Sequence, residues 1–389
     1  MRWAILLCLL SMASHNLAAD DTDLPQTTPN DAGIDCDVLC EMSQWIRREK
    51  LDVRAMVLLR DGKLVMEWYA ADVTREHNHN TFSVTKSVAA TLAGIAIHEC
   101  DVPGVDATLD TLLSQSKNVV DADPKQTISL KQLLTMSSGF PVTRGNRPNA
   151  DPLRQLFDQV HNAPDRNRFV LGLPLDRSPG SSFAYNNNDP QLVAAIVHEA
   201  YDANLVTIAE QKLFTPLQFH NAVWMFRDGK GNPPGGYGLR LRAIDMAKLG
   251  QLYLQQGRWN GETIFDAALC REATSDQTGT GYGYFWWTAP DAQGEKSFAA
   301  KGVRGQLIYV DPATRIVFAV ASDLPPEKVR PVMAKLTKEL LPKAVSSWQA
   351  TENNLEAEQR WEAELAKAAQ YRSQHRDGLP AVRLPQLAP

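Results

Sequence analysis

One stretch decides how this chain is interpreted: residues 81–97, with the sequence TFSVTKSVAATLAGIAI. It changes from polar to small and apolar after Ser83, which predicts that a buried helix begins there. A serine in the first turn meets the positive end of the helix dipole, which favours a developing alkoxide or oxyanion. Lys86 follows one turn later on the same face, so a lysine with a lowered pKa can take the serine proton. By itself, the Ser-x-x-Lys spacing also fits a capped helix with an exposed lysine.

A second polar motif supports the first. Residues 179–189 read PGSSFAYNNND, and the Pro-Gly pair predicts a turn. Tyr185 and Asn187 then place a phenol and an amide on one side of an extended segment. A phenol beside an ammonium group ionises more easily and can act as a base, while an amide can hold both the lysine and a substrate carbonyl. We therefore expect Tyr185 to share proton transfer with Lys86.

The third motif lies near the end of the chain. Residues 300–306 read AKGVRGQ and come directly before two apolar runs, 307–310 and 316–321, which are joined by an Asp-Pro turn. These runs predict two strands of a hairpin. Glycines before a strand suit an edge that a ligand or another backbone approaches closely.

Together these motifs resemble the serine β-lactamase and penicillin-binding-protein superfamily, on the branch nearest class C β-lactamases. That branch also holds carboxylesterases, D-aminopeptidases and 6-aminohexanoate-dimer hydrolases. The chain resembles the 6-aminohexanoate-dimer hydrolases in particular, because their third motif also ends in Gly-x-x-Gly-Gln before a Tyr-Val-Asp-Pro turn. The resemblance covers residues 50–342 and includes two helices and an aromatic strand, at 128–139, 238–254 and 281–287.

The order of the elements predicts an α+β fold. Two apolar runs around Asp61-Gly62 predict a hairpin near the start of the domain, and residues 281–322 return to strands. Helical and irregular segments lie between them. We therefore expect an antiparallel sheet built from both chain ends, flanked by helices, with a mostly helical lobe inserted (β-lactamase/transpeptidase-like). The site would lie in the cleft where Ser83, Tyr185 and Gly302 converge.

The third motif departs from the pattern of penicillin-handling members, which carry Lys-Thr-Gly or His-Thr-Gly. Alignment on the glycines puts Ala300 at the position of the cation and Lys301 at that of the threonine. Alignment on charge makes Lys301 the cation. We prefer the first, because a slip of one residue turns every side chain of a strand to the other face. A β-lactam carboxylate then loses its usual anchor unless Lys301 or Arg304 replaces it, which argues against a strong β-lactamase.

The resemblance implies a serine hydrolase that cleaves an amide or ester of a small molecule through an acyl-enzyme on Ser83, with Lys86 and Tyr185 as the proton shuttle. The backbone N–H groups of Ser83 and Val303 would hold the oxyanion. Two alternatives stay open: β-lactamase or D,D-peptidase activity, and a catalytically silent penicillin-fold binding protein. No metal or organic cofactor is implied. The residues expected to bind substrate are Asn187, Gly302, Val303 and Arg304.

Composition agrees with an exported enzyme. The chain has 389 residues and a formal net charge of −5, with no basic stripe, so we expect no nucleic-acid partner. Residues 1–19 combine a basic residue, a short apolar core and a Leu-Ala-Ala cleavage site, which predicts a signal peptide and a periplasmic or secreted protein. No other run is long enough for a membrane span.

The remaining segments divide the chain further. Residues 20–49 are predicted as a leader, 50–342 as the hydrolase domain and 343–389 as a charged helical and Pro-rich tail. His77 and His79 are expected to be solvated or capping residues, because no third metal ligand accompanies them. Four cysteines follow the signal peptide, and both disulfides and free thiols are open. They are Cys36, Cys40, Cys100 and Cys270.

Overall fold

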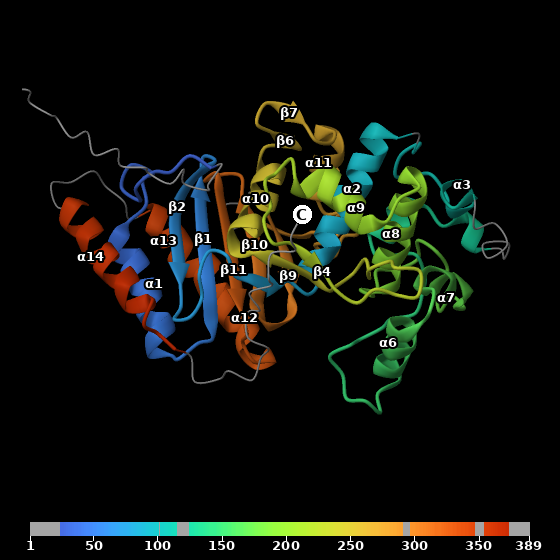
Figure 1. Ribbon diagram of the computed structural model, residues 1–389, viewed down its shortest axis with the longest axis horizontal. Coiled ribbons are helices and arrows are strands. Elements are labelled where there is room, and N and C mark those ends of the chain that lie inside the picture. Colours follow the sequence, from blue (N-terminus) through green and yellow to red (C-terminus); the bar gives the residue numbers. More distant parts are fainter. Residues whose placement is uncertain (1–23, 101, 115–123, 291–295, 347–353, 373–389) are drawn as a thin grey trace, which may run out of the picture.

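A six-stranded antiparallel sheet organises the protein (Figure 1). The computed structural model describes residues 24–100, 102–114, 124–290, 296–346 and 354–372, so the predicted signal peptide lies outside the described residues. The strand order is β2-β1-β11-β10-β9-β8. Their bounds are β1 (Val53–Arg60), β2 (Lys63–Tyr69), β8 (Trp287–Pro290), β9 (Lys296–Gly302), β10 (Gln306–Asp311) and β11 (Ile316–Ser322).

The sheet joins the two ends of the domain, as the sequence predicted. Strand β1 pairs with β2 on one side and with β11 on the other, where Val57 lies opposite Ala319. The β1–β2 turn has positive φ at both central residues, 53° at Asp61 and 77° at Gly62. These values suit the tight hairpin turn whose twist matches the strands. The expected α+β fold is therefore confirmed.

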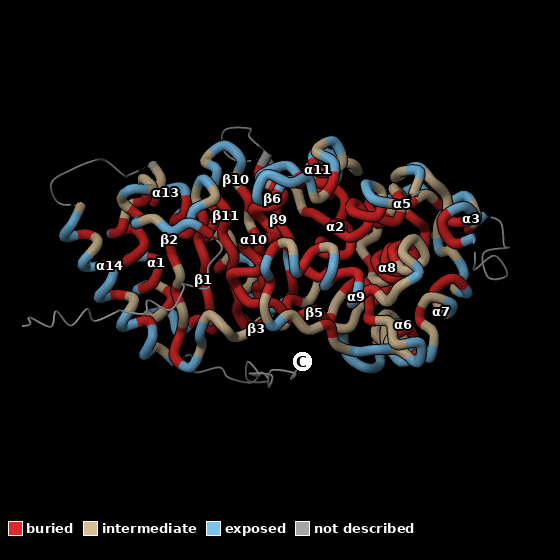
Figure 2. The backbone as a smooth tube through the Cα atoms, turned by 45° about the horizontal axis from the view of Figure 1, so that its top comes forward, coloured by how far each residue is buried: buried red, intermediate tan, exposed pale blue. Residues whose placement is uncertain are grey.

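Two long helices cover one face of the sheet: α2 (Val84–Glu99) and α10 (Ala243–Leu254). Helix α10 lies close to the strands because Gly250 has no side chain there; an added Cβ would come within 2.6 Å of Val317. Helix α2 is buried along most of its length and also packs against α8 (Asn188–Tyr201). It therefore lies between the sheet and the helical lobe (Figure 2).

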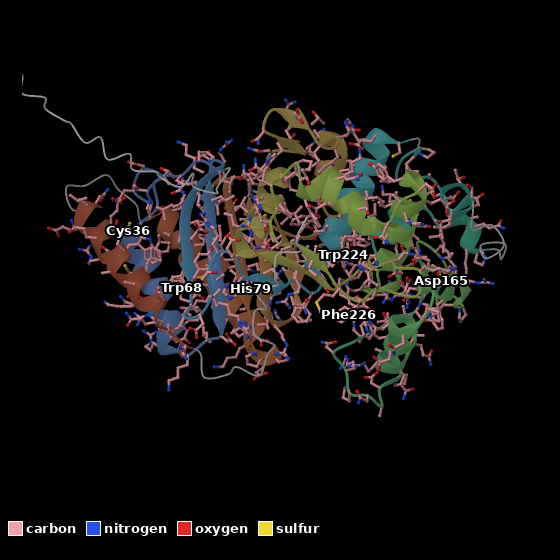
Figure 3. The ribbon with its side chains drawn as sticks, viewed as in Figure 1. Cys36, Trp68, His79, Asp165, Trp224 and Phe226 are labelled. Atoms are coloured by element: carbon pink, nitrogen blue, oxygen red, sulfur yellow. The ribbon has the colours of Figure 1, made fainter. Side chains whose placement is uncertain are left out.

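The opposite face is covered by helices from both chain ends. They are α1 (Cys36–Arg48), α12 (Pro326–Ala334), the π-helix η5 (Lys335–Leu340), α13 (Leu341–Ser346) and α14 (Asn354–Ala368). Trp68 of β2 lies under this layer (Figure 3), and its indole N–H donates to Ser43 of α1 at 2.9 Å. The buried carboxylate of Glu364 in α14 accepts hydrogen bonds from Ser43 and Arg47.

This packing differs from the leader predicted for residues 20–49. Residues 36–48 form α1, an amphipathic helix whose apolar side packs on the sheet, so they belong to the folded body. The tail over 343–389 was predicted as charged and helical before its Pro-rich end, and α14 occupies residues 354–368 of it and contacts α1 and β2. Residues 373–389 lie outside the described residues.

The inserted lobe is mostly helical, as expected. Helix α8 forms its buried centre (Figure 2). The other helical elements are α3 (Leu109–Leu112), η2 (Lys125–Thr127), α5 (Leu130–Leu134), α6 (Pro152–Asn162), α7 (Arg166–Gly172), α9 (Leu205–Ala209) and η3 (Glu210–Phe214). Beside the large sheet lie two small ones and a further helix: β3 (Asn78–Asn80), β4 (Val223–Trp224) and β5 (Leu239–Arg242), then β6 (Arg258–Trp259) and β7 (Glu262–Thr263), with α11 (Ala267–Ala273).

The aromatic strand predicted over residues 281–287 is shorter in the structure. Strand β8 begins only at Trp287, because Phe285 adopts a positive φ of 59° that interrupts extended backbone. The Phe285 N–H instead donates to the carbonyl of Leu134, and its own carbonyl accepts from Ser87 of α2. This irregular segment thereby ties the sheet edge to α2 and to the lobe.

The two histidines before α2 lie in different environments, and the cysteines are unpaired in the described part of the chain. His79 lies buried on β3 (Figure 3), and burial lowers its pKa to about 3, so the prediction of a solvated or capping residue was wrong for it. His77 instead accepts from the backbone N–H of Thr74. Among the described residues no disulfide joins the cysteines: Cys36, Cys40, Cys100 and Cys270 are all free.

Membrane and metal features can be tested on the described chain. None of its helices is by itself long and apolar enough to cross a membrane. One pair, Asn188–Tyr201 with Leu205–Phe214, passes by length and composition but is bent by 79°. Within the same part of the chain, no group of three or more His, Cys, Asp or Glu side chains could hold a metal ion.

Candidate active site

Lys86 is the centre of the candidate site. Its Nζ atom lies 3.2 Å from the Oγ atom of Ser83, 2.7 Å from the Oδ1 atom of Asn187 and 2.9 Å from the carbonyl oxygen of Gly236. Tyr185 lies beside it, with the ring centroid 5.0 Å from Nζ. The structure thus brings Ser83 and Lys86 together with Tyr185 and Asn187, which follow about a hundred positions later in the sequence.

Burial sets the protonation of this cluster. Lys86 is fully enclosed, and desolvation together with the nearby charge of Arg144 lowers its pKa to about 7. At neutral pH Lys86 is therefore an uncharged amine in a large fraction of the molecules, and this amine can accept a proton.

Tyr185 behaves differently from the sequence expectation. Burial raises the pKa of its phenol to about 12, although hydrogen bonding to Ser83 and the charge of Arg144 oppose this shift. The expected ionisation relied on a neighbouring ammonium group, and that neighbour loses its charge near neutral pH. Tyr185 is therefore a protonated phenol when Lys86 is a neutral amine.

The backbone around Ser83 presents its hydroxyl to Lys86. Ser83 is the N-cap of α2, yet its side chain makes no capping hydrogen bond and stays available. Phe82 precedes it with a positive φ of 46°, an unfavourable conformation for a bulky residue. Thr81 holds this bend, because its N–H and its hydroxyl both donate to the carbonyl of Leu239 in β5.

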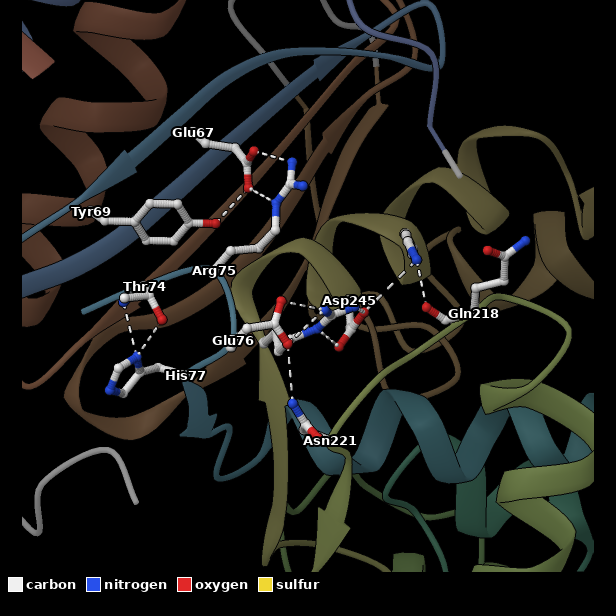
Figure 4. A network of polar contacts seen from close by, with 11 residues as sticks. Glu67, Tyr69, Thr74, Arg75, Glu76, His77, Gln218, Asn221 and Asp245 are labelled. Atoms are coloured by element: carbon white, nitrogen blue, oxygen red, sulfur yellow. Dashed lines mark hydrogen bonds and ion pairs between the residues drawn. The ribbon is translucent and has the colours of Figure 1, made fainter. Parts of the chain in front are cut away.

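An ion-pair network around the buried carboxylate of Asp245 anchors the strands that lead into this bend (Figure 4). Arg242 of β5 donates to both carboxylate oxygens of Asp245 at 2.9 Å, and it also pairs with Glu76 just before β3. Asn221 donates to the same Glu76 carboxylate. The network fixes β3 against β5, and thereby the position of the chain as it enters Ser83.

The Tyr185–Asn187 loop is held by its own asparagines. The Asn186 side-chain oxygen accepts from the N–H groups of Asn188 and Asp189, both at 2.8 Å, which caps the start of α8. The Asn187 N–H donates to the hydroxyl of Thr143. This polar run therefore orients Asn187 toward Lys86.

Strand β9 ends beside the nucleophile. A Cβ on Gly302 would lie 2.4 Å from the carbonyl oxygen of Thr81, so only glycine fits there. Val303 follows as the first residue of the 3₁₀-helix η4 (Val303–Gly305), where N–H groups have no partner within the helix. The Ser83 N–H also has no acceptor among the described residues. Both groups can therefore receive an oxyanion.

The side chains of β9 alternate between the two faces of the sheet. Ala300 is buried in the core cluster that includes α2, whereas Lys301 pairs across the sheet with Leu307, a residue of the opposite cluster. Lys301 lies with its Nζ atom 5.5 Å from the Trp287 ring centroid. The face of β9 that carries Ala300 therefore has no cation at this position.

Arg304 has a partner of its own. Its guanidinium donates to Asp323 at 2.7 Å, and Asp323 also pairs with Arg54. Arg304 has a positive φ of 63°, and its carbonyl accepts from Leu324 and from the Ser322 hydroxyl. These bonds stabilise the turn after Gly302, and the predicted contact of Arg304 with substrate stays a prediction.

Three more neighbours complete the cluster; sequence reasoning missed Gly236 and Arg144 and placed Trp287 only in the aromatic strand. Gly236 accepts from Lys86, Trp287 stacks on Tyr185 with centroids 5.6 Å apart, and the Arg144 guanidinium carbon lies 5.3 Å from the Tyr185 ring centroid. Arg144 follows closely on the segment 128–139 that resembles the family, and this position was the available signal. Gly236 lies in a Pro-Pro-Gly-Gly run that predicts only a turn.

Comparison with known proteins identifies the family. The family model described as beta-lactamase matches residues 50–341. The chain belongs to the beta-lactamase family. Within this family it is similar to the 6-aminohexanoate-dimer hydrolase of Paenarthrobacter ureafaciens, at 23% identity over 308 residues, which is 73% of this chain and 76% of the relative. A putative D-alanyl-D-alanine carboxypeptidase of Escherichia coli (strain K12) is 24% identical over 248 residues, 57% of this chain and 55% of the relative.

Solved structures of the beta-lactamase family share the fold. A putative 6-aminohexanoate-dimer hydrolase from Bacillus anthracis superposes with a TM-score of 0.68 at 20% identity, covering 85% of this chain and 89% of the other. The hydrolase EstCE1, described as having promiscuous acyltransferase activity, has a TM-score of 0.62 at 18% identity, covering 80% and 99%. These four relatives are hydrolases by their names.

Proposed function

We propose that this protein is a serine hydrolase that cleaves an amide or ester bond through an acyl-enzyme on Ser83. The environment of Lys86 carries this proposal. Its Nζ atom contacts two oxygens that can only accept hydrogen bonds, on Asn187 and Gly236, and a third that can donate, on Ser83. A neutral amine has two N–H groups and one lone pair. With both N–H groups donated, the lone pair faces the Ser83 hydroxyl.

The first chemical step follows from this arrangement. The Ser83 oxygen forms a bond to the substrate carbonyl carbon while its proton moves to Lys86. The carbonyl oxygen becomes an oxyanion that the N–H groups of Ser83 and Val303 stabilise. The C–O or C–N bond then breaks, and the leaving group takes a proton from Lys86 through the Tyr185 phenol. A water molecule hydrolyses the acyl-enzyme with Lys86 again as the base.

Two observations favour an open-chain amide or ester over a β-lactam. The relative of known name acts, by that name, on a 6-aminohexanoate dimer, which is a linear amide. The Ala300 side of β9 lacks the cation that penicillin-handling members use for the substrate carboxylate. We therefore propose β-lactamase activity as at most a minor one.

Active-site labelling tests the mechanism. The purified protein is treated with a fluorophosphonate probe and, separately, with p-nitrophenyl esters and linear aminohexanoate amides. We expect one covalent adduct, which mass spectrometry maps to the peptide containing Ser83, and ester turnover that Ser83→Ala abolishes. A catalytically silent binding protein would take no label and release no p-nitrophenol, and that result would overturn the proposal.

We also propose that the protein works in the periplasm or outside the cell, on the basis of residues 1–19. Expression of the full chain followed by N-terminal sequencing of the exported fraction tests this. Cleavage after Ala19 is expected, and an uncleaved cytoplasmic product would contradict it.

A further inference from the structure

Arg144 is the feature of the site that the proposed mechanism does not use. Its guanidinium carbon lies 5.3 Å from the Tyr185 ring centroid, and the side chain is partly buried. The loop that carries it is fixed, because the Arg144 N–H donates to the carbonyl of Leu153 in α6 at 3.0 Å. Its charge also reaches the reaction centre, since it acts on both Lys86 and Tyr185.

The neighbouring arginines have carboxylate partners, but Arg144 has none among the described residues. Arg154 donates to Asp158 at 2.8 Å, and Arg147 lies 4.0 Å from Asp151. Within the described part of the chain, Arg144 faces the aromatic ring of Tyr185 and the repulsive charge of Arg147. A guanidinium has five N–H donors, and no described residue accepts a hydrogen bond from the guanidinium of Arg144. These donors are therefore open to a ligand that brings acceptors.

We propose that Arg144 binds a carboxylate of the substrate, so that the preferred substrates are amides or esters carrying a carboxylate near the scissile carbonyl. This inference rests on the proposed hydrolase function. A guanidinium can bind a carboxylate through two parallel hydrogen bonds, which fixes the orientation as well as the position of the substrate. Ala300 of β9 carries no charge, and Arg144 supplies a cation from the helical lobe instead.

The charges around Arg144 agree with an anionic ligand. The titratable groups that act on it are the Tyr185 phenol and the Arg147 guanidinium, and it acts in turn on Lys86. None of these groups is an anion at neutral pH. Asp151, the nearby carboxylate, is engaged by Arg147 and caps α6 through the N–H of Leu153. The site therefore has positive potential and no internal counter-ion within this group.

Matched pairs of esters test the proposal. One pair places the charge in the acyl half: the mono-p-nitrophenyl ester of adipic acid and the same ester with its carboxylate capped as a methyl ester. The other places it in the leaving group: 4-acetoxybenzoate and its methyl ester. The readout is the ratio of kcat/KM for the anionic and the neutral member of each pair. The kcat/KM of the neutral esters measures the hydrolase activity alone, and the ratio measures the contribution of Arg144 to carboxylate binding.

We expect the wild type to prefer the anionic member of at least one pair. Arg144→Gln should lower that ratio by about 10- to 100-fold, mainly through KM, because a charge-assisted hydrogen bond is lost. Arg144→Lys should recover part of the ratio. Arg147→Gln is the matched control, since it removes a neighbouring arginine that has a carboxylate partner, and it should leave the ratio unchanged.

Three results would overturn the proposal. The wild type could show no anionic preference in either pair. Arg144→Gln could lower kcat/KM equally for the anionic and the neutral ester and shift the pH profile of the reaction. That result would make Arg144 a positioning residue for Lys86 and Tyr185. If no ester is turned over, the proposed function fails, and calorimetric titration of Ser83→Ala with adipic acid monoamide still tests the anchor. Absence of binding, or equal binding after Arg144→Gln is added, would then overturn it.

Discussion

The Nζ atom of Lys86 lies 3.2 Å from the Oγ atom of Ser83, one helical turn away in sequence and enclosed by protein on all sides. Two further acceptors fix the amine, so its position does not depend on the conformational freedom of a long side chain. Burial lowers the pKa of Lys86 to about 7, which turns an ordinary cation into a base available at neutral pH.

The first prediction concerns this pair. Ser83→Ala and Lys86→Ala should each reduce ester turnover by about three orders of magnitude or more, and the double variant should lose little beyond that, because the two groups act as a unit. Initial rates with a p-nitrophenyl ester measure this. Ser178→Ala removes an exposed hydroxyl and is the control. Near-normal turnover by Ser83→Ala would contradict the mechanism.

The second prediction is the pH dependence of catalysis. Protonated Lys86 cannot accept the Ser83 proton, so kcat/KM should rise with pH through about 7 and then reach a plateau. Because burial raises the pKa of Tyr185 to about 12, the rising limb of this pH profile reports the titration of Lys86.

Tyr185→Phe should therefore lower the plateau and keep the midpoint of the limb. A pH–rate series on both proteins measures this. Loss of the limb in Tyr185→Phe would show instead that the phenol and the amine share one proton and titrate as a pair.

The third prediction concerns β-lactams. Short-chain p-nitrophenyl esters should exceed nitrocefin in kcat/KM by about 10- to 100-fold, since the Ala300 position offers no charge-assisted contact to the β-lactam carboxylate. Parallel assays on one preparation give the comparison. Nitrocefin turnover equal to that of the esters would mean that another cation has taken this role.

The fourth prediction concerns stability and pH. Asp189 is fully buried, its Oδ2 atom has no partner among the described residues, and desolvation raises its pKa from 3.8 to about 7. The folded protein then holds this proton more tightly than the unfolded chain. The resulting stabilisation is complete below about pH 4 and is lost as the pH rises through about 7.

Asp189→Asn should remove this dependence while keeping the oxygen that accepts from Ser138. Compared with the wild type, its Tm should be equal or lower at pH 5 and higher at pH 9, where the ionised wild-type carboxylate costs about 2–4 kcal/mol. Thermal unfolding at the two pH values measures the crossing. Parallel Tm curves would show that Asp189 is ionised throughout.

The fifth prediction concerns the C-terminal helix. The buried Glu364 carboxylate joins α14 to Ser43 and Arg47 of α1. Glu364→Ala leaves the partly exposed Arg47 without its counter-ion and should lower the free energy of unfolding by about 2–3 kcal/mol. Glu356→Ala, on the exposed side of the same helix, should change it by less than about 0.5 kcal/mol. Urea titration distinguishes the two, and equal effects would contradict the anchoring role.

Several features of the fold could be predicted from local patterns. The Asp61-Gly62 hairpin follows from the dihedral angles that such a turn requires, and β10 and β11 follow from short apolar runs around an Asp-Pro turn. The prediction of the aromatic strand was wrong at Phe285. The backbone of this residue makes hydrogen bonds to Leu134 and Ser87, and no local sequence pattern records such tertiary contacts. Helix α1, within the segment predicted as a leader, was not predicted for the same reason, since it gains its place by packing on the sheet.

Local spacing was enough to predict which groups could act together: a one-turn spacing sets Ser83 and Lys86 on one helix face, and a two-residue spacing sets Tyr185 and Asn187 on one side of a loop. Their protonation states and their neighbouring residues could be seen only in the folded chain. The tertiary structure buried Lys86 against the carbonyl of Gly236 and placed Arg144 over Tyr185 without a carboxylate among the described residues. The physical reason is that spacing is a property of the local backbone, whereas desolvation and unpaired charge depend on segments that meet only when the chain folds.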